Sequence, residues 1–132
     1  MLIQVLYISR STYPRGDLTD LEILKTANRK NKLANVTGAL LRDNRRFLQI
    51  LEGETAAVLH TIEAIQQDPR HFDVNILFQR AIETRFFGDW SMGYSEINKE
   101  TVAQFESLSK TFSEALDAAL VDLKPSIQTP AL

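Results

Sequence analysis

Cysteine is absent from this 132-residue sequence, and its absence removes several kinds of site at once. Without a thiol, the chain can form no disulfide, zinc–thiolate site or iron–sulfur cluster, and it has no cysteine nucleophile. No apolar run approaches the roughly 18 residues of a membrane span, and residues 1–7 lack the basic start of a signal peptide. We therefore expect a cytosolic protein with no membrane partner.

Glycine and proline are also scarce, with five and four residues, so the chain is not collagen-like or of low complexity. Its length suits one domain with a core of its own, and 44% hydrophobic and 24% charged residues are ordinary for a soluble protein. The net charge is −2, but residues 10–46 hold nine basic side chains against four acidic ones. This excess would attract a phosphate-bearing ligand or nucleic acid, unless it is a solvated face balanced elsewhere in the fold.

Apolar periodicity predicts the element order β-α-β-β-α-β, followed by a fifth strand and a helical segment. The predicted strands cover 2–9, 39–42, 47–52, 72–81 and 91–96, and the predicted helices cover 19–32 and 54–67. Between 102 and 123 the apolar spacing indicates one helix, or two short ones broken near Ser109. Pro125 and Pro130 then mark a flexible tail over 125–132.

This order predicts an α+β fold, a ferredoxin-like βαββαβ sandwich with an extra fifth strand. Right-handed crossovers place the first and third strands side by side, with both helices on one face of the sheet. The C-terminal helix or helices can then cover the opposite face. Because this frame supports many functions, function has to be inferred from a site.

Three polar side chains fall at positions that should be buried. Tyr7 is in the middle of the first strand, and Gln49 is in the middle of the third, so the phenol and the amide can pair. Asn31 follows Leu24 by seven residues and shares its inward helix face. Each alone is typical of a satisfied core residue, whereas together they indicate a planar ligand with polar edges between sheet and helices.

Other residues are candidates for the same place. Ile23 and Ile65 are potential flat apolar walls, although core packing is the simpler interpretation of each. Arg70 would reach a carbonyl or phosphate oxygen, or be an ordinary surface arginine. His71 has no metal partner except the distant His60, so we expect no metal site.

The last strand adds a Trp–Met pair. Trp90 and Met92 are two residues apart, so within a strand they would share a face. Such a pair is more often core or interface filling than chemistry, but in a short strand after a polar loop it would also serve as a movable edge.

The sequence resembles the BLUF domains, blue-light sensors that use FAD, over about residues 1–97. The resemblance rests on an ordered set of short segments with matching spacing: Leu6-Tyr7-Ile8-Ser9, Asn31 before Val36-Thr37-Gly38-Ala39-Leu40-Leu41, Phe47-Leu48-Gln49-Ile50-Leu51-Glu52-Gly53, Asp68-Pro69-Arg70-His71 and Trp90-Ser91-Met92. It implies noncovalent FAD between the two helices. Absence of cysteine also excludes the thiol–flavin adduct of another class of blue-light sensor.

The resemblance implies roles for individual residues. Tyr7 and Gln49 match the photoactive pair, Asn31 the residue at the C4 carbonyl and N3 edge of the ring, and Arg70 the basic residue near the C2 carbonyl. Trp90 and Met92 match the switch positions of the last strand. The full set of implied flavin contacts is Tyr7, Ile23, Arg29, Lys30, Asn31, Gln49, Ile65, Asp68, Arg70 and His71, in which Arg29 and Lys30 would meet the phosphates or the adenine part.

The implied mechanism is a hydrogen-bond switch. Light drives an electron and then a proton from Tyr7 toward the flavin and back, while Gln49 rotates or tautomerises and presents a different donor and acceptor pattern. The changed network then biases the last strand and the C-terminal helix. The chemistry leaves no product, so we expect a sensor and not an enzyme.

We expect three parts: a flavin-binding core over 1–97, a helical relay over 98–124 and the tail. So short a chain should act through a separate signalling protein or a change of homo-oligomer, a dimer or larger, without nucleic acid. Three alternatives remain: a ligand-binding regulatory module without photochemistry, an acylphosphatase-like enzyme and an RNA-binding sheet. The enzyme would need a glycine-rich anion loop near the N-terminus, but the first glycine is Gly16. The RNA-binding sheet would need aromatic stacking on the third strand, which Gln49 and Leu51 do not continue.

Overall fold

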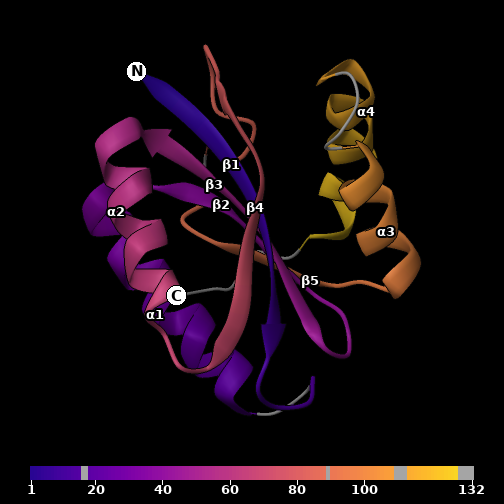
Figure 1. The fold of residues 1–132 in the computed structure, drawn as a ribbon. Helices are drawn as coiled ribbons and strands as arrows, with labels where there is room; N and C mark the ends of the chain where they lie inside the picture. Colours follow the sequence, from indigo (N-terminus) through magenta and orange to yellow (C-terminus); the bar gives the residue numbers. More distant parts are fainter. Residues whose placement is uncertain (16–17, 89, 109–112, 128–132) are drawn as a thin grey trace.

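A computed structural model describes residues 1–15, 18–88, 90–108 and 113–127. The fold has three layers, with a five-stranded sheet between two pairs of helices (Figure 1). The elements in chain order are β1 (Leu2–Ser11), α1 (Leu18–Ala34), β2 (Thr37–Arg42), β3 (Arg46–Glu54), α2 (Thr55–Gln66), β4 (His71–Ala81), β5 (Gly93–Glu96), α3 (Lys99–Leu108), α4 (Ser113–Leu123) and a 3₁₀ turn at Lys124–Ser126.

The sheet order is β4-β1-β3-β2-β5, which confirms the predicted ferredoxin-like arrangement with the first and third strands adjacent. Strands β4, β1, β3 and β2 pair with one another in antiparallel fashion, and β5 pairs with β2 in parallel. The register places Tyr7 of β1 directly opposite Gln49 of β3. Both strands are central and almost fully buried, as expected for strands that are apolar on both faces.

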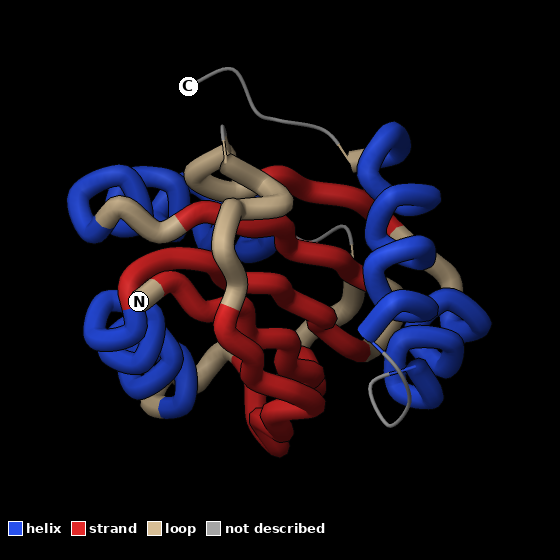
Figure 2. The backbone as a smooth tube through the Cα atoms, turned by 90° about the horizontal axis from the view of Figure 1, so that it is seen from above, coloured by secondary structure: helices blue, strands red, loops and turns tan. Residues whose placement is uncertain are grey.

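Each face of the sheet has its own apolar core. On the α1/α2 face, Val5, Leu51 and Val58 belong to one buried cluster. On the α3/α4 face, Leu6, Ile50 and Phe105 belong to the other. Viewed along the sheet, the helix pairs lie on opposite sides of the strands, so the C-terminal helices cover the second face as predicted (Figure 2).

Helix α1 ends in a defined turn that leads into β2. Asn35 follows the helix in the left-handed region, with φ 55°. The Val36 amide then donates to the Asn31 carbonyl at 2.9 Å, which caps the helix end. Gly38 of β2 lies so close to the backbone of β3 that a Cβ atom at this position would be 1.9 Å from the Ile50 carbonyl oxygen.

The prediction for the last strand is wrong at its start. Strand β5 begins at Gly93, so Trp90 and Met92 precede it and do not share a face. Met92 is buried in the α1/α2 cluster, whereas Trp90 packs against the α3/α4 cluster. Side chains alternate between faces only inside a strand. Trp90 instead ends a turn, in which its amide donates to the Phe87 carbonyl at 3.2 Å.

The C-terminal segment forms two helices, the second of the alternatives considered, and the expected break at Ser109 lies outside the described residues. Beyond α4 the chain stays packed past the expected boundary at 125. Ile127 is buried in the α3/α4 cluster, and its amide donates to the Lys124 carbonyl at 3.1 Å. Residues 128–132 of the expected tail also lie outside the described residues.

Candidate functional site

A cleft of about 490 Å³ lies between α1 and α2 above the centre of the sheet. Ile23 of α1 and Ile65 of α2 line its two walls, and Tyr7 and Gln49 lie on its floor. Phe47, on the same strand as Gln49, also faces it. The sequence therefore brings two apolar walls and a polar floor together in one place.

Tyr7 and Gln49 are joined by a buried hydrogen bond in which the phenol donates to Oε1 of the amide. Burial raises the pKa of Tyr7 far above its ordinary value, and the negative charge of Asp68 raises it further. The phenol therefore keeps its proton and remains a donor. The Gln49 amide nitrogen points the other way and donates to the Met92 sulfur at 3.4 Å.

Asn31 lines the cleft and is 3% exposed, which confirms its predicted inward position. Its amide nitrogen donates to the Ser91 carbonyl at 2.9 Å. No described residue donates to its Oδ1, which is therefore free to accept a hydrogen bond from a ligand.

Sequence reasoning missed a second asparagine on the same helix face. Asn28 accepts a hydrogen bond from the Ser91 hydroxyl at 2.7 Å and donates to the Met92 carbonyl at 3.4 Å. The signal was present, because Asn28 follows Leu24 by four residues and belongs to the same buried stripe of α1. Together with Asn31, it fixes the segment that carries Met92.

Asp68 and Arg70 form an ion pair at the end of α2, with 2.6 Å between Nη2 and Oδ2. The hydrogen bond from Arg70 lowers the pKa of Asp68, and the same bond raises the pKa of Arg70. Both residues line the cleft. The guanidinium is held in place by the carboxylate and keeps further N–H groups for a ligand.

His71 also lines the cleft, but both of its ring nitrogens contact the protein. Nε2 donates to the Ile65 carbonyl at 2.7 Å, and Nδ1 pairs with the Ser9 hydroxyl at 2.7 Å. Since a carbonyl can only accept, Nε2 must carry a proton. The ring meets Tyr7 edge to face, with 6.3 Å between centroids, so His71 connects the end of α2 to β1 beside the phenol.

Three predicted site residues do not line the cleft, although one of them, Met92, contacts the lining residue Gln49. Arg29 is exposed and does not line it, whereas Lys30 does, because one residue along a helix turns the side chain by about 100°. Trp90 lies on the other face of the sheet. Three polar lining residues were not predicted: Thr26, His60 and Thr61.

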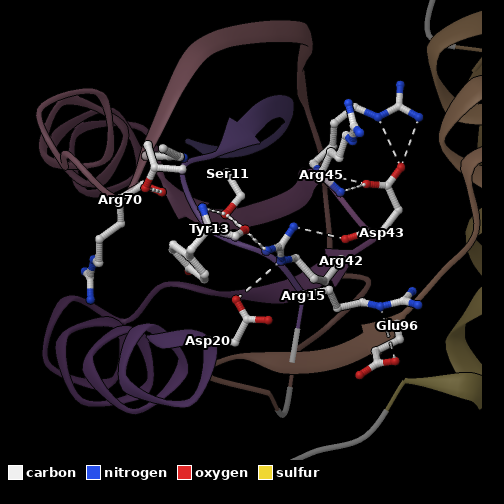
Figure 3. Close-up of polar contacts among 12 residues, drawn as sticks. Ser11, Tyr13, Arg15, Asp20, Arg42, Asp43, Arg45, Arg70 and Glu96 are labelled. Carbon is white, nitrogen blue, oxygen red and sulfur yellow. Dashed lines mark hydrogen bonds and ion pairs between the residues drawn. The ribbon is translucent and has the colours of Figure 1, made fainter. Parts of the chain in front are cut away.

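A buried arginine packs against Phe47 of the cleft, and Figure 3 shows it among its polar partners. Arg42 is fully buried, and its guanidinium lies 4.5 Å from the centre of the Phe47 ring. It donates to Asp20 at 3.3 Å, to the Ser11 hydroxyl at 3.0 Å and to the Tyr13 carbonyl at 2.9 Å. Arg42 thereby joins β2 to the start of α1 and to the loop after β1.

The cleft suits a flat aromatic ligand with polar edges. Its walls are aliphatic, and unused polar groups of Asn31 and Arg70 face the opening. A flavin ring system has this chemistry, with apolar faces and carbonyl and N–H groups along its edges. The donor and acceptor set of the cleft is therefore compatible with a flavin.

Comparison with protein families agrees with this chemistry. The family model described as sensors of blue light using FAD, BLUF, matches residues 2–93. The chain belongs to the BLUF family. It is thus a member of a family of blue-light sensors that bind a flavin.

Relatives of this BLUF chain include much longer proteins. Photoactivated adenylate cyclase subunit beta of Euglena gracilis is 34% identical over 114 residues, which cover 86% of this chain and 13% of that protein. Subunit alpha of the same organism is 34% identical over 113 residues, which cover 11% of its length. This chain therefore spans only about an eighth of these relatives.

Solved BLUF structures share the fold at similar length. The photo-activated state of BlsA is 29% identical, with a TM-score of 0.80, and the match covers 98% of this chain and 99% of that one. The dark state of BlrB, a BLUF protein, is 27% identical, with a TM-score of 0.68, and the match covers 95% of each chain. Among the described residues of this chain, no helix is long and apolar enough to cross a membrane.

Proposed function

We propose that this chain is a blue-light receptor that binds FAD noncovalently between α1 and α2 and signals through a switch formed by Tyr7 and Gln49. The observation that carries the proposal is the buried Tyr7–Gln49 hydrogen bond on the floor of an open cleft. FAD is chosen over other flavins because the family description names it.

The flavin ring would be held by residues from both helices. Ile23 and Ile65 would contact its two faces, and Asn31 and Arg70 would meet its polar edges. Lys30 is the basic residue of α1 that lines the cleft and would meet the phosphates, whereas its neighbour Arg29 does not line the cleft. Asp68 and His71 would act mainly by holding Arg70 and the end of α2 in position.

A bound flavin supplies absorption of blue light and an excited state that accepts an electron. Tyr7 would be the electron donor to that excited state, and its hydrogen bond to Gln49 would carry its proton away and later return it as the electron comes back. Burial supports this role, because the phenol is protonated at all ordinary pH values and has one defined acceptor. During this excursion Gln49 rotates or tautomerises.

Rotation of Gln49 would break its contact with Met92, whereas tautomerisation would first change its contact with Tyr7. In the structure the amide nitrogen donates to the thioether sulfur. Rotation would turn Oε1 toward that sulfur, and the contact would be lost because a thioether has no proton to donate. Tautomerisation would place a proton on Oε1 and reverse its hydrogen bond with Tyr7. Met92 is therefore the residue that reports the state of Gln49 to the last strand.

The route out of the cleft continues through the segment before β5. Glu52, fully buried on β3, accepts the amides of Phe86 at 3.0 Å and Phe87 at 2.6 Å. From the other side, Lys124 donates to the Phe86 carbonyl at 2.8 Å and lies 5.3 Å from the Trp90 ring centre. Phe86, Phe87 and residues 90–92 thus lie between the cleft and the 3₁₀ turn that follows α4.

A second connection crosses the sheet to α4. Gln4 donates to Glu52 at 2.8 Å and accepts from Arg80 at 2.8 Å, and Arg80 pairs with Asp117 of α4 at 2.6 Å. These contacts would couple the proposed sensing core over 1–97 to the proposed helical relay over 98–124. The relay would pass the signal to a separate protein or to a second copy of the chain.

The test is an absorption measurement on the purified protein. We expect a yellow preparation that releases FAD on denaturation, shifts slightly to the red under blue light and recovers in the dark. Replacing Tyr7 by Phe should keep the flavin and abolish the shift, because the phenolic proton and the electron donor are removed. A colourless protein that cannot take up FAD would contradict the proposal, as would a normal red shift in the Tyr7→Phe protein.

A further inference from the structure

A cluster of basic side chains at one end of the sheet has no part in the proposed photochemistry. Two hollows, of about 600 and 580 Å³, flank the tip of the β2–β3 hairpin. The side chains of Arg10, Arg15 and Arg45 line both. We call these three residues, together with Arg46 and Lys99 of the second hollow, the basic rim.

Most cations of the basic rim are available for a partner. Arg45 is exposed, and its guanidinium forms no hydrogen bond or ion pair with another described residue. Arg10 meets Asp73 at 3.9 Å and Arg15 meets Glu96 at 3.7 Å, each with partly exposed side chains (Figure 3 shows the second pair). Exposed pairs of this length are weak and are readily exchanged for another carboxylate.

Asp43, the acidic residue at the centre of the basic rim, is already fully paired within the hairpin. Asp43 is 5% exposed, and its Oδ1 accepts the backbone amides of Arg45 at 2.9 Å and Arg46 at 2.6 Å. Its Oδ2 accepts the Arg46 guanidinium at 3.0 Å. Because both oxygens are occupied, Asp43 shapes the hairpin tip. Arg46 also pairs with Glu106 at 3.4 Å, so Arg45 is the exposed cation of the tip that has no acidic partner among the described residues.

The walls of the hollows favour a protein partner over nucleic acid. Phe72 is 48% exposed and lines the first hollow with Pro14, while Ile97 lines the second. These surfaces suit a large apolar side chain next to carboxylates. A duplex would need cations along a continuous stripe, whereas Glu96 and Glu100 interrupt the cations of the rim. A short acidic segment needs only Arg45 and the cations next to it.

We propose that the basic rim docks a short acidic segment of the downstream protein, with an aromatic side chain set against Phe72. Arginine forks bind carboxylates in pairs, which fits three guanidinium groups around one hairpin tip. That the docked protein is the signalling partner rests on the proposed function. The site lies at the end of the relay strand, because the Ile97 amide donates to the Arg42 carbonyl at 2.9 Å directly after β5.

The test is a titration of the flavin-loaded protein with a fluorescently labelled peptide of alternating Glu and Gly that contains one Phe. Saturable binding should weaken about tenfold between low and high salt, since the contacts are exposed ion pairs. Arg45→Glu should weaken it about tenfold as well, and Phe72→Ala should weaken it severalfold. Lys25→Glu, on an exposed position of α1 outside the rim, is the matched control and should leave binding unchanged.

Two results would overturn the docking proposal. One is the absence of saturable binding up to about 1 mM peptide. The other is a labelled 20-base-pair duplex whose affinity falls about tenfold on Arg45→Glu, while the affinity of the peptide is unchanged by that substitution. The red shift of the wild-type and Arg45→Glu proteins, recorded in the same samples, separates this failure from failure of the photoreceptor proposal. Arg45 lies outside the cleft, so its substitution should leave the spectrum unchanged.

Discussion

The two faces of the sheet are built from the same strands but are completed differently. On the α3/α4 face, apolar side chains such as Leu6, Ile50 and Phe105 close the core with the chain's own helices. On the α1/α2 face, Tyr7 and Gln49 are buried beside an open cleft. One face is thus a finished core, whereas the other has directional polar groups that a ligand would complete.

This difference implies different roles: the α3/α4 face stabilises the fold, and the α1/α2 face binds the ligand. Apolar packing on the α3/α4 face is not directional and supplies stability, and its buried polar groups are paired with one another. On the cleft face, the hydrogen-bonding groups of Tyr7 and Gln49 adjoin a cavity that a ligand can enter. The segment that contains Trp90 and Met92 joins the two, because its residues are divided between the faces. We expect substitutions on the two faces to have separable effects on stability and on flavin chemistry.

The largest effect on stability should come from Phe105→Ala on the α3/α4 face. Phe105 is 1% exposed, and removal of a buried phenylalanine costs about 3–5 kcal/mol of unfolding free energy. Urea unfolding should show this loss, with an unchanged flavin spectrum in the protein that remains folded. Val121→Ala, on an exposed position of α4, should change stability by less than about 0.5 kcal/mol, and equal losses would contradict the assignment of Phe105 to the core.

A smaller loss should follow from Glu52→Gln, whose buried carboxylate holds the Phe86–Phe87 turn on the α3/α4 face. The substitution keeps the shape but replaces an oxygen that accepts the Phe86 or Phe87 amide by a donor. One buried group is left unsatisfied, at a cost of about 1–3 kcal/mol. The exposed Glu54→Gln is the control, and urea unfolding midpoints that fall equally in both proteins would contradict this role of Glu52.

Asn31→Ala should act on the cleft face alone. Loss of one ligand hydrogen bond predicts about tenfold weaker flavin binding, measured by titration of the apoprotein. Asn28→Ala removes similar contacts to Ser91 and Met92 but does not touch the cleft, so its flavin affinity should stay close to that of the wild type. An equal loss in both variants would mean that Asn31 acts only by holding Ser91.

The smallest effect is a pH dependence from Asp68. The pKa of its carboxyl is lowered in the folded protein, so the charged form stabilises the fold above its ordinary pKa of about 3.9. This contribution is lost as the pH falls from there through the folded pKa. Asp68→Asn should cost less than about 1 kcal/mol at neutral pH and should flatten the acid limb of the stability curve. Asp122→Asn, on an exposed position of α4, should leave that limb unchanged.

Much of the fold and part of the candidate site could be predicted from sequence alone. Apolar alternation located the strands, and strand order then placed Tyr7 beside Gln49. Buried charges could not be found this way, because Arg42 and Glu52 look like surface residues until the sheet buries them. The division of Trp90 and Met92 between two faces also depends on a turn that no periodicity reveals.

The most direct test of the account compares two buried glutamines on the two faces of the sheet. Gln49 contacts Tyr7 at the cleft, and Gln4 contacts Glu52 away from it. Light-minus-dark absorption spectra should show the reversible red shift in the wild type and in Gln4→Leu, although the latter is less stable. In Gln49→Leu the flavin should remain bound and the shift should be absent. A normal red shift in Gln49→Leu would contradict the switch that this account assigns to Gln49.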